Sequence, residues 1–244
     1  MFYSYGGIIK MSLFLKSSTA NDGTYSFTLL GNISIVVLII AILLLSCAFF
    51  GKKLKLSPKQ LAFTSVTLAI AFLTSFIKLF NLPMGGSITL FSMLFVTLIG
   101  YWYGIKIGIT AGVAFGLLQL IVNPYIISLP QTITDYILAF GALGLSGIFT
   151  NSKHGLIKGY IAGVFGRFVF AVLSGVIFFS SYTSFLGMTN SFAYSIAYNG
   201  IYLFSEMALT LGLLALSSCS KSFTNGLSYI TKLATGENMP AQLF

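Results

Sequence analysis

The sequence predicts an all-α integral membrane protein, and three observations indicate this class. The chain is 57% hydrophobic and 7% charged, with a mean hydropathy of +0.96, whereas a soluble domain carries about 25% charged residues. Apolar stretches of about 17 to 25 residues recur along it, which is the length that a helix needs to cross a bilayer. The short alternating segments of a membrane barrel are absent, so helices are expected to satisfy the backbone in lipid.

The formal charge of +9 indicates membrane topology rather than nucleic-acid binding. The lysines lie at the ends of the apolar stretches and do not share one interleaved face. Cys47 and Cys219 are isolated and lack metal spacing, so they are expected to be free thiols. His154, the one histidine, lies in a polar loop. The sequence therefore predicts no metal site and no histidine-based catalytic triad.

Residues 1–59 are expected to form a polar and aromatic tail, an extra membrane helix at 33–50 and a basic linker. A cleavable signal peptide has a basic start and a small-residue cleavage site, whereas the lysines here follow the apolar run. We therefore interpret 33–50 as a retained anchor. Lys52, Lys53, Lys55 and Lys59 follow it.

Residues 60–217 are expected to form a domain of six spans, followed by a cytoplasmic tail at 218–244. Turn-forming residues such as Pro83 with Gly85 and Gly86 separate the spans. The loop at 101–106 is short enough to make the second and third of these spans a tight antiparallel pair. The six predicted spans are 61–80, 88–104, 105–122, 130–150, 157–181 and 192–217.

The distribution of lysines predicts that the N-terminus lies outside the cell and the C-terminus in the cytoplasm. With the basic linker inside, the loops at 81–87, 123–129 and 182–191 fall outside, and none of them contains Lys or Arg. This asymmetry follows the positive-inside rule. Lys10 and Lys16 in the outer tail are exceptions, as is Lys78, which can snorkel at its helix end. The lysines placed inside are Lys106, Lys153, Lys158, Lys221 and Lys232.

Small residues four apart predict close helix contacts. They include Gly108, Gly112 and Gly116 in one span and Gly159 with Gly163 in another, and for these we favour packing inside the bundle. The span at 61–80 carries a similar ridge, which is a candidate surface for a partner protein: Ser65 with Ala69, and Thr67 with Ala71.

Asp135 is the main candidate for a functional side chain, because the chain has only four acidic residues and carboxylates within membrane helices are usually functional. It lies about five residues from the outer end of its span, or roughly 7 Å deep. Protonation, or capping by the hydroxyls of Thr132 or Thr134, is the structural alternative. Aromatic faces attract cations, so rings at the same depth predict a site for a flat, positively charged solute. These rings are Tyr136, Phe170, Phe178, Phe179, Tyr182 and Tyr194.

Arg167 and Glu206 share a depth near the middle of the membrane and are expected to form a structural ion pair, because a lone charge there is costly. The sequence contains no phosphate-binding G-x-x-x-x-G-K-[ST] loop, so we expect no ATP binding by this chain. It contains no constellation of nucleophile, base or ligand cluster typical of an enzyme. We detect no inverted repeat of the kind that self-sufficient transporters carry.

Three ordered motifs resemble a known family. They are LPMGGSITL, then YGIKIGITAGVAFGLLQL, then LPQTITDYILAFGALGLSGIF, and they continue in GRFVFAVLSGVIFFSSY and YSIAYNG. Over residues 60 to 217 this series is similar to the thiamine-specific substrate-binding subunits, or S components, of energy-coupling factor transporters.

The resemblance implies a six-helix S component that captures thiamine from outside and works with a membrane coupling subunit and two ATPase subunits, without a cofactor of its own. Asp135 matches the acidic residue that contacts the thiamine cation. The coupling ridge of the family corresponds to Ser65, Thr67, Ala69 and Ala71. The other implied binding residues are Tyr136, Phe179, Tyr194 and Asn199, with Gly85 and Gly86 in the gate over the pocket.

Two features depart from the family pattern. Ala171 stands where the family has a pocket histidine, which leaves room and removes a hydrogen-bonding ring. The anchor at 33–50 is extra to the six-helix pattern. The ligand alternatives are a thiamine precursor or another vitamin, such as a hydroxymethylpyrimidine or pyridoxine compound. The remaining alternative is a structural membrane protein without transport activity.

Overall fold

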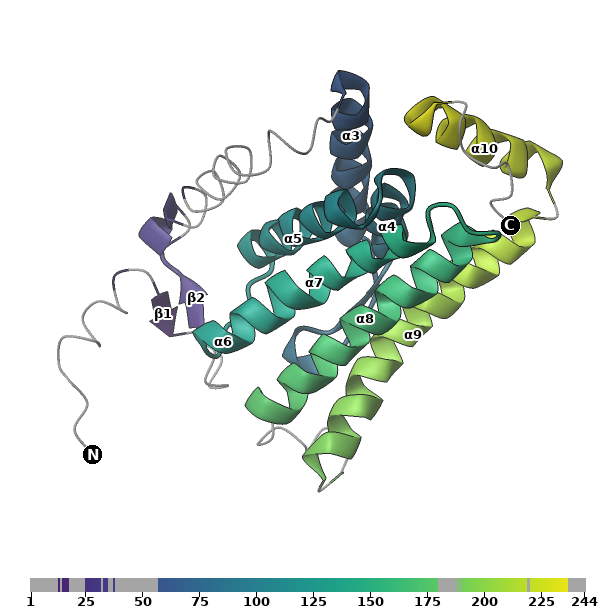
Figure 1. Cartoon of the computed structure of the whole chain (residues 1–244). Helices are drawn as coiled ribbons and strands as arrows, with labels where there is room; N and C mark the ends of the chain where they lie inside the picture. Colours follow the sequence, from purple (N-terminus) through teal and green to yellow (C-terminus); the bar gives the residue numbers. More distant parts are fainter. Residues whose placement is uncertain are drawn as a thin grey trace, which may run out of the picture.

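The structure, a computed structural model, describes residues 57–179, 188, 190–218 and 220–236, with short N-terminal pieces at 13, 15–17, 25–31, 33–34 and 37. The described chain is a bundle of helices with two small hairpins (Figure 1). One hairpin pairs β1, Leu15–Ser17, with β2, Tyr25–Phe27. Most of the predicted anchor at 33–50 lies outside the described residues.

Helix α3, Pro58–Ser75, begins at a capping box. The Ser57 hydroxyl accepts from the Gln60 N–H at 3.2 Å, and the Gln60 side chain accepts from the Ser57 N–H at 3.0 Å. These bonds satisfy donors that a helix start leaves free, and Pro58 fits the first turn because it has no N–H to satisfy.

The predicted boundaries near residue 80 are wrong, because a β-hairpin stands between the first two spans. Strand β3, Lys78–Asn81, pairs antiparallel with β4, Ser87–Thr89. A short turn, η1 at Pro83–Gly85, joins them, with Met84 at φ 63° and Gly85 at φ 89°. Left-handed backbone at these two positions folds the chain back on itself. Consequently α3 ends at Ser75 and α4, Ser92–Tyr103, begins after the hairpin.

Helices α4 and α5, Ile105–Val122, are joined by Gly104 alone, which confirms the predicted tight pair. The glycines of α5 pack against the backbone of the fourth span: a Cβ on Gly108 would lie 2.9 Å from Gly144 Cα, and one on Gly116 would collide with the Tyr136 carbonyl. Gly112 likewise abuts the Phe140 carbonyl. The prediction that these glycines pack inside the bundle is confirmed.

The fourth span is a composite helix. It begins as α6, Leu129–Thr132, widens into a π-helical segment, η2 at Ile133–Leu138, and continues as α7, Ala139–Gly141, and a 3₁₀ segment, η3 at Ala142–Phe149. Figure 1 shows these pieces as one continuous rod. Asp135 and Tyr136 both lie in the π-helical segment, a geometry that is frequent at functional sites.

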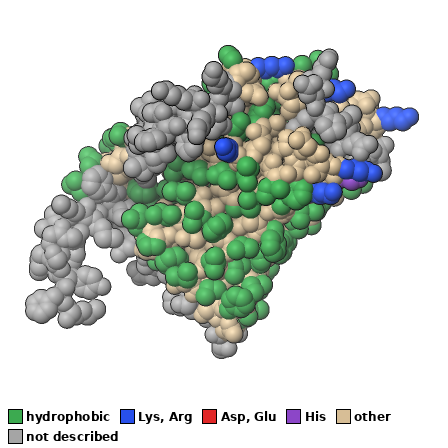
Figure 2. Space-filling view, in the orientation of Figure 1, with side chains coloured by type: hydrophobic (Ala, Val, Ile, Leu, Met, Phe, Trp, Pro, Cys, Tyr) green, Lys and Arg blue, Asp and Glu red, His purple; other side chains and the backbone are tan. Residues whose placement is uncertain are grey.

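Helices α8, Gly155–Phe178, and α9, Ser191–Ser218, run side by side, and α10, Lys221–Thr235, lies across one end of the bundle (Figure 1). In the described residues, four segments are long and apolar enough to cross a membrane: 105–122, 129–149, 155–178 and 191–216. Helix α4 is shorter, at 12 residues. Figure 2 shows apolar side chains over the face of these helices, with most of the visible lysines toward the end of the bundle that carries α10.

Candidate functional site

A cavity of about 140 Å³ lies between the hairpin, the C-terminal end of α5, η2, α8 and α9. The eight residues that the resemblance implies for binding all line this cavity, although they come from distant parts of the chain. Their binding to a ligand stays a prediction. They are Gly85, Gly86, Asp135, Tyr136, Ala171, Phe179, Tyr194 and Asn199. Of the rings predicted from their depth alone, Phe170 and Phe178 are not among the lining residues of the cavity, and Tyr182 lies outside the described residues.

Asp135 is held by a glutamine one helical turn before it. Gln131 Nε2 donates to Asp135 Oδ2 at 2.6 Å and to the Tyr125 carbonyl at 3.1 Å. The Gln131 side-chain oxygen Oε1 accepts from the Ile127 N–H at 3.1 Å, and the residue is 1% exposed. Gln131 therefore fixes both the carboxylate and the loop above it. Sequence reasoning missed it, although its spacing of four residues from Asp135 was the available signal.

The predicted alternative, in which threonines cap Asp135, is wrong. The Thr134 hydroxyl donates to the Pro130 carbonyl at 2.9 Å, and the Thr132 hydroxyl donates to the Ser128 carbonyl at 2.9 Å. Both hydroxyls satisfy backbone carbonyls of their own helix, as threonines in helices commonly do. The oxygen atoms of Asp135 on the cavity wall are therefore not engaged by these threonines.

Aromatic rings form one wall of the cavity. The Tyr136 hydroxyl donates to the Asn123 carbonyl at 3.0 Å and accepts from the Tyr125 N–H at 2.8 Å, so it holds the loop before α6. The ring of Tyr125 stacks on Phe179 with centroids 5.9 Å apart and an interplanar angle of 21°. Tyr125 is a cavity residue that the sequence analysis missed, since its position in a loop gave no periodic signal.

A ladder of side chains four residues apart on α9 holds the hairpin over the cavity. Tyr194 stacks on Tyr198 at 5.8 Å, and Tyr198 packs edge-on against Tyr202 at 5.9 Å. The Tyr198 hydroxyl accepts from the Gly86 N–H at 3.0 Å and donates to the Pro83 carbonyl. A Cβ on Gly86 would lie 2.7 Å from that hydroxyl, which explains the glycine.

Glu206 is the next member of this α9 ladder, and it caps the start of α4. Its carboxylate accepts from the Thr89 N–H at 3.0 Å, the Thr89 hydroxyl at 2.7 Å and the Met93 N–H at 3.2 Å. Phe91, at the N-cap of α4, offers no side-chain cap. The free N–H groups and positive dipole end of a helix favour such a carboxylate.

The predicted ion pair between Arg167 and Glu206 is wrong for the described residues, where the two charges form no direct bridge. Arg167 instead places its guanidinium 4.0 Å from the ring centroid of Phe140, while Glu206 is bound by the hairpin and α4. Both residues still line the cavity. The shared depth therefore predicted correctly that the two residues lie at one site, but not that they contact each other.

Asn199 ties α8 to α9. Its amide nitrogen donates to the Ala171 carbonyl at 3.2 Å and to the Ser195 carbonyl at 2.9 Å, and its oxygen accepts from the Tyr202 hydroxyl at 3.0 Å. Since an amide has two donor hydrogens, only the oxygen retains capacity to bind a solute in this arrangement.

Comparison with known proteins identifies the family. Residues 61–224 match the family model described as thiamine transporter protein (Thia_YuaJ). The chain belongs to this thiamine transporter family. It is 34% identical over 137 residues to the thiamine transporter ThiT of Bacillus subtilis (strain 168), covering 50% of this chain and 70% of that protein.

The fold of this thiamine transporter family member is also similar to a solved structure of ThiT from Listeria monocytogenes. The TM-score is 0.57 at 24% identity, and the match covers 67% of this chain and 96% of that one. Together with the four apolar helices, membership in the family identifies the chain as a multi-pass membrane protein.

Two further residues of α8 line the cavity. Ala171 is 7% exposed and presents only a methyl group to the cavity. One turn later along α8, Ser174 is 1% exposed in the cavity wall, and its hydroxyl lies beside the Asp135 carboxylate as a hydrogen-bonding group. A buried hydroxyl beside this carboxylate is a candidate for contact with a bound solute.

The predicted coupling ridge on α3 is divided between two faces. Thr67 is 6% exposed and Ala71 is fully buried, so both pack inside the bundle. Ser65 and Ala69 are exposed. In this conformation the surface open to a partner therefore includes Ser65 and Ala69 but not Thr67 or Ala71.

Proposed function

We propose that this member of the thiamine transporter family binds thiamine from outside the cell and delivers it as the S component of an energy-coupling factor transporter. The observation that carries the proposal is the cavity, in which the oriented carboxylate of Asp135 lies among aromatic side chains. The named relative ThiT of Bacillus subtilis, a thiamine transporter, supports the choice of vitamin.

Asp135 is proposed to pair with the cationic or amino-bearing part of the ligand. Opposite charges attract more strongly in a partly buried site than in water, and Gln131 holds the carboxylate in place. Phe179, Tyr136 and Tyr194 would supply aromatic surface for a flat cation. Asn199 would accept a hydrogen bond through its oxygen, and the loop with Gly85 and Gly86 would close the site.

Transport is proposed to require a membrane coupling subunit and two ATPase subunits, because the chain carries no phosphate-binding loop of its own. The exposed part of α3 around Ser65 and Ala69 would contact the coupling subunit. In this scheme the chain is a binding subunit rather than an enzyme and uses no cofactor. Its N-terminus lies outside and its C-terminus lies in the cytoplasm.

Isothermal titration of the purified chain with thiamine tests the ligand. We expect saturable binding with one site, together with a rise in the thermal unfolding midpoint. Hydroxymethylpyrimidine and pyridoxine form the comparison panel. Tighter binding of pyridoxine would favour a different vitamin, and no heat or thermal shift with any of the three would reject vitamin capture.

Substitution of the carboxylate tests the charge pairing. Asp135→Asn keeps the size of the side chain but removes its charge, and hydrogen bonds to charged groups contribute about 1.5 to 3 kcal/mol. We therefore expect thiamine affinity to fall by about 10- to 100-fold in titration. Thr134→Val is the matched control, since the Thr134 hydroxyl bonds to a backbone carbonyl. Unchanged affinity in Asp135→Asn would remove the charge-pairing argument.

A further inference from the structure

Helix α10 is strongly amphipathic, although its overall hydrophobicity is low. Four large apolar side chains on it are exposed: Phe223 at 40%, Tyr229 at 64%, Ile230 at 45% and Leu233 at 38%. At 100° per residue these side chains share one side of the helix, and the lysines lie on the opposite side. The polar side carries Lys221, Asn225 and Lys232, all exposed.

A third edge of α10 fixes it to the bundle. Trp102 Nε1 donates to the Thr231 hydroxyl at 3.2 Å, and the Tyr103 hydroxyl donates to the Ala234 carbonyl at 3.1 Å. Thr231 and Ala234 are 4% and 2% exposed. The exposed apolar stripe lies beside this packed edge, so it remains uncovered when the helix is docked on α4.

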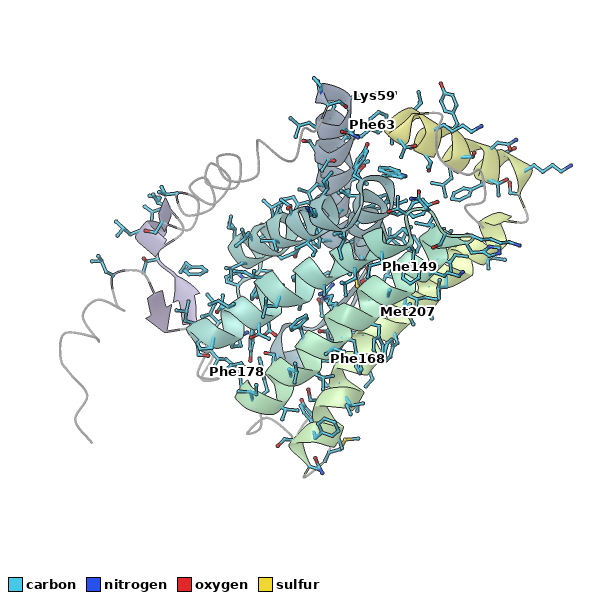
Figure 3. All side chains as sticks on the ribbon, viewed as in Figure 1. Lys59, Phe63, Phe149, Phe168, Phe178 and Met207 are labelled. Carbon is cyan, nitrogen blue, oxygen red and sulfur yellow. The ribbon has the colours of Figure 1, made fainter. Side chains whose placement is uncertain are left out.

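The exposed apolar side chains of α10 lie at the same depth in the membrane as the ends of the spanning helices. The helix follows the C-terminal end of α9 and crosses the end of the bundle (Figure 1). Figure 3 shows Lys59 and Phe63 on the end of α3 that approaches α10. Phe63 packs edge-on against Trp102, with ring centroids 6.5 Å apart. Because the spans are embedded in lipid, a helix across their ends lies at the membrane surface.

Positive charge gathers at the same end (Figure 2). Helix α10 itself contains no Asp or Glu, and Glu237, which follows it in the sequence, lies outside the described residues. Lysines near a membrane surface are attracted to anionic lipid headgroups. The lysines at the ends of the neighbouring helices are Lys59, Lys106, Lys153 and Lys158.

We propose that α10 is an interfacial helix that lies in the plane of the membrane at the lysine-rich end of the bundle. Phe223, Ile230 and Leu233 enter the acyl-chain boundary, and Lys221 and Lys232 contact anionic headgroups. An apolar stripe opposite lysines on a helix of low overall hydrophobicity is the pattern of such helices. Through Trp102 and Tyr103, this contact would fix how α4 sits in the bilayer.

The proposal goes beyond thiamine capture. The family match ends at residue 224, so most of α10 lies outside it. The contact with lipid rests on the membrane embedding of the bundle and not on the identity of the ligand. A protein partner on the same stripe is the competing explanation, and the experiment below separates the two.

Site-directed fluorescence in lipid nanodiscs tests the proposal on the full chain. Ile230→Cys on the apolar stripe and Asn225→Cys on the polar side are each labelled with a polarity-sensitive dye, in a background with Cys47→Ser and Cys219→Ser. The discs contain phosphatidylglycerol and phosphatidylcholine with brominated acyl chains, which quench a dye in contact with lipid. Leu233→Cys is the second variant should Ile230→Cys fail to fold, as judged by its thermal unfolding.

We expect the dye at position 230 to be quenched by brominated chains at least threefold more than the dye at 225, with the reverse order for aqueous iodide. Discs without phosphatidylglycerol, or the double change Lys221→Gln with Lys232→Gln, should reduce the lipid quenching at 230. Equal iodide quenching at both positions would overturn the proposal. Protection from iodide without lipid quenching, or protection that appears only with added ATPase and coupling subunits, would instead indicate a protein contact.

Thiamine titration in the same discs separates this proposal from the proposed function. A chain that binds thiamine but shows no lipid quenching at position 230 contradicts only the interfacial helix. A chain that shows the quenching without binding thiamine contradicts only the vitamin assignment.

Discussion

Gln131 shows how a single buried amide can prepare a binding carboxylate. It joins Asp135 to the loop that carries Tyr125, so the position of the charge and the position of an aromatic wall depend on one side chain. Replacing it leaves buried partners without a hydrogen bond, which costs about 1 to 3 kcal/mol for each unsatisfied group.

Gln131→Leu is therefore expected to weaken thiamine binding by about tenfold and to lower the free energy of unfolding by about 1 to 3 kcal/mol. Titration and chemical unfolding of the same preparations measure both quantities. Gln119→Leu provides a comparison, because Gln119 also lines the cavity but its amide donates to Ser75 rather than to Asp135. If Gln131→Leu bound thiamine as tightly as the unmodified chain, the orienting role would be excluded.

Ala171 offers a second test at the level of one side chain. A leucine there would project into the cavity, so Ala171→Leu is expected to lower thiamine affinity at least about tenfold, as overpacking costs about 1 to 3 kcal/mol. Ala193→Leu, on an exposed position of α9, is the matched control and should bind normally. Normal binding by Ala171→Leu would mean that the ligand does not reach this wall.

At the residue scale, the sequence located Asp135 and the cavity residues because a charge in lipid is rare and a resemblance supplied the rest. Side-chain contacts that were inferred only from the depth of two residues in the membrane were predicted incorrectly. Arg167 and Glu206 share a depth, but depth along a span says nothing about the direction of a side chain around the helix axis. The capping role of Glu206 depends on the hairpin, which no pattern predicted.

At the scale of elements, hydropathy predicted the long helices well and the short elements poorly. Residues 78–81 and 87–89 form strands, but they are only four and three residues long, and the turn residues Pro83, Gly85 and Gly86 between them indicate a loop between two spans as readily as a hairpin. The π-helical segment was also missed. Its geometry accompanies the contact between the Tyr136 carbonyl and Gly116 of α5, and such tertiary packing cannot be predicted from one segment.

The contact of Gly116 with the π-helical segment predicts a strong effect of one methyl group. A Cβ at position 116 would collide with the Tyr136 carbonyl, so Gly116→Ala is expected to destabilise the protein by about 1 to 3 kcal/mol through overpacking. It should also displace Tyr136 and weaken thiamine binding.

Gly212→Ala serves as the control, because nothing lies within 4 Å of a Cβ at that position in α9. Alanine is the better helix former by about 1 kcal/mol, so this variant should be at least as stable as the unmodified chain. Thermal unfolding followed by circular dichroism measures both. Equal stability of the two variants would contradict the close approach of α5 and η2.

At the scale of the whole molecule, the charge distribution predicts orientation in the membrane. The loop before α6 should face outward and the loop before α8 should face the cytoplasm. Asn123→Cys and Lys153→Cys, each in a background without Cys47 and Cys219, place single thiols in these loops.

A membrane-impermeant maleimide should label Asn123→Cys in intact cells and label Lys153→Cys only after permeabilisation. Labelling is carried out without thiamine, because Asn123 lines the cavity. The opposite labelling pattern would reverse the assignment of the cavity to the outer leaflet, and the lysine-rich end would then face outward.

Contacts with the hairpin over the cavity fix the rotation of α9 about its own axis. They come from one face of the helix, which carries Tyr194, Tyr198, Tyr202 and Glu206. Adding a single residue between 202 and 206 would turn the carboxylate by about 100° while leaving the three rings in register. The hairpin would then keep its hydrogen bond from Gly86 to Tyr198 and lose the one from Thr89 to Glu206. Natural insertions should therefore be tolerated in the loops on either side of α9 far better than within this stretch.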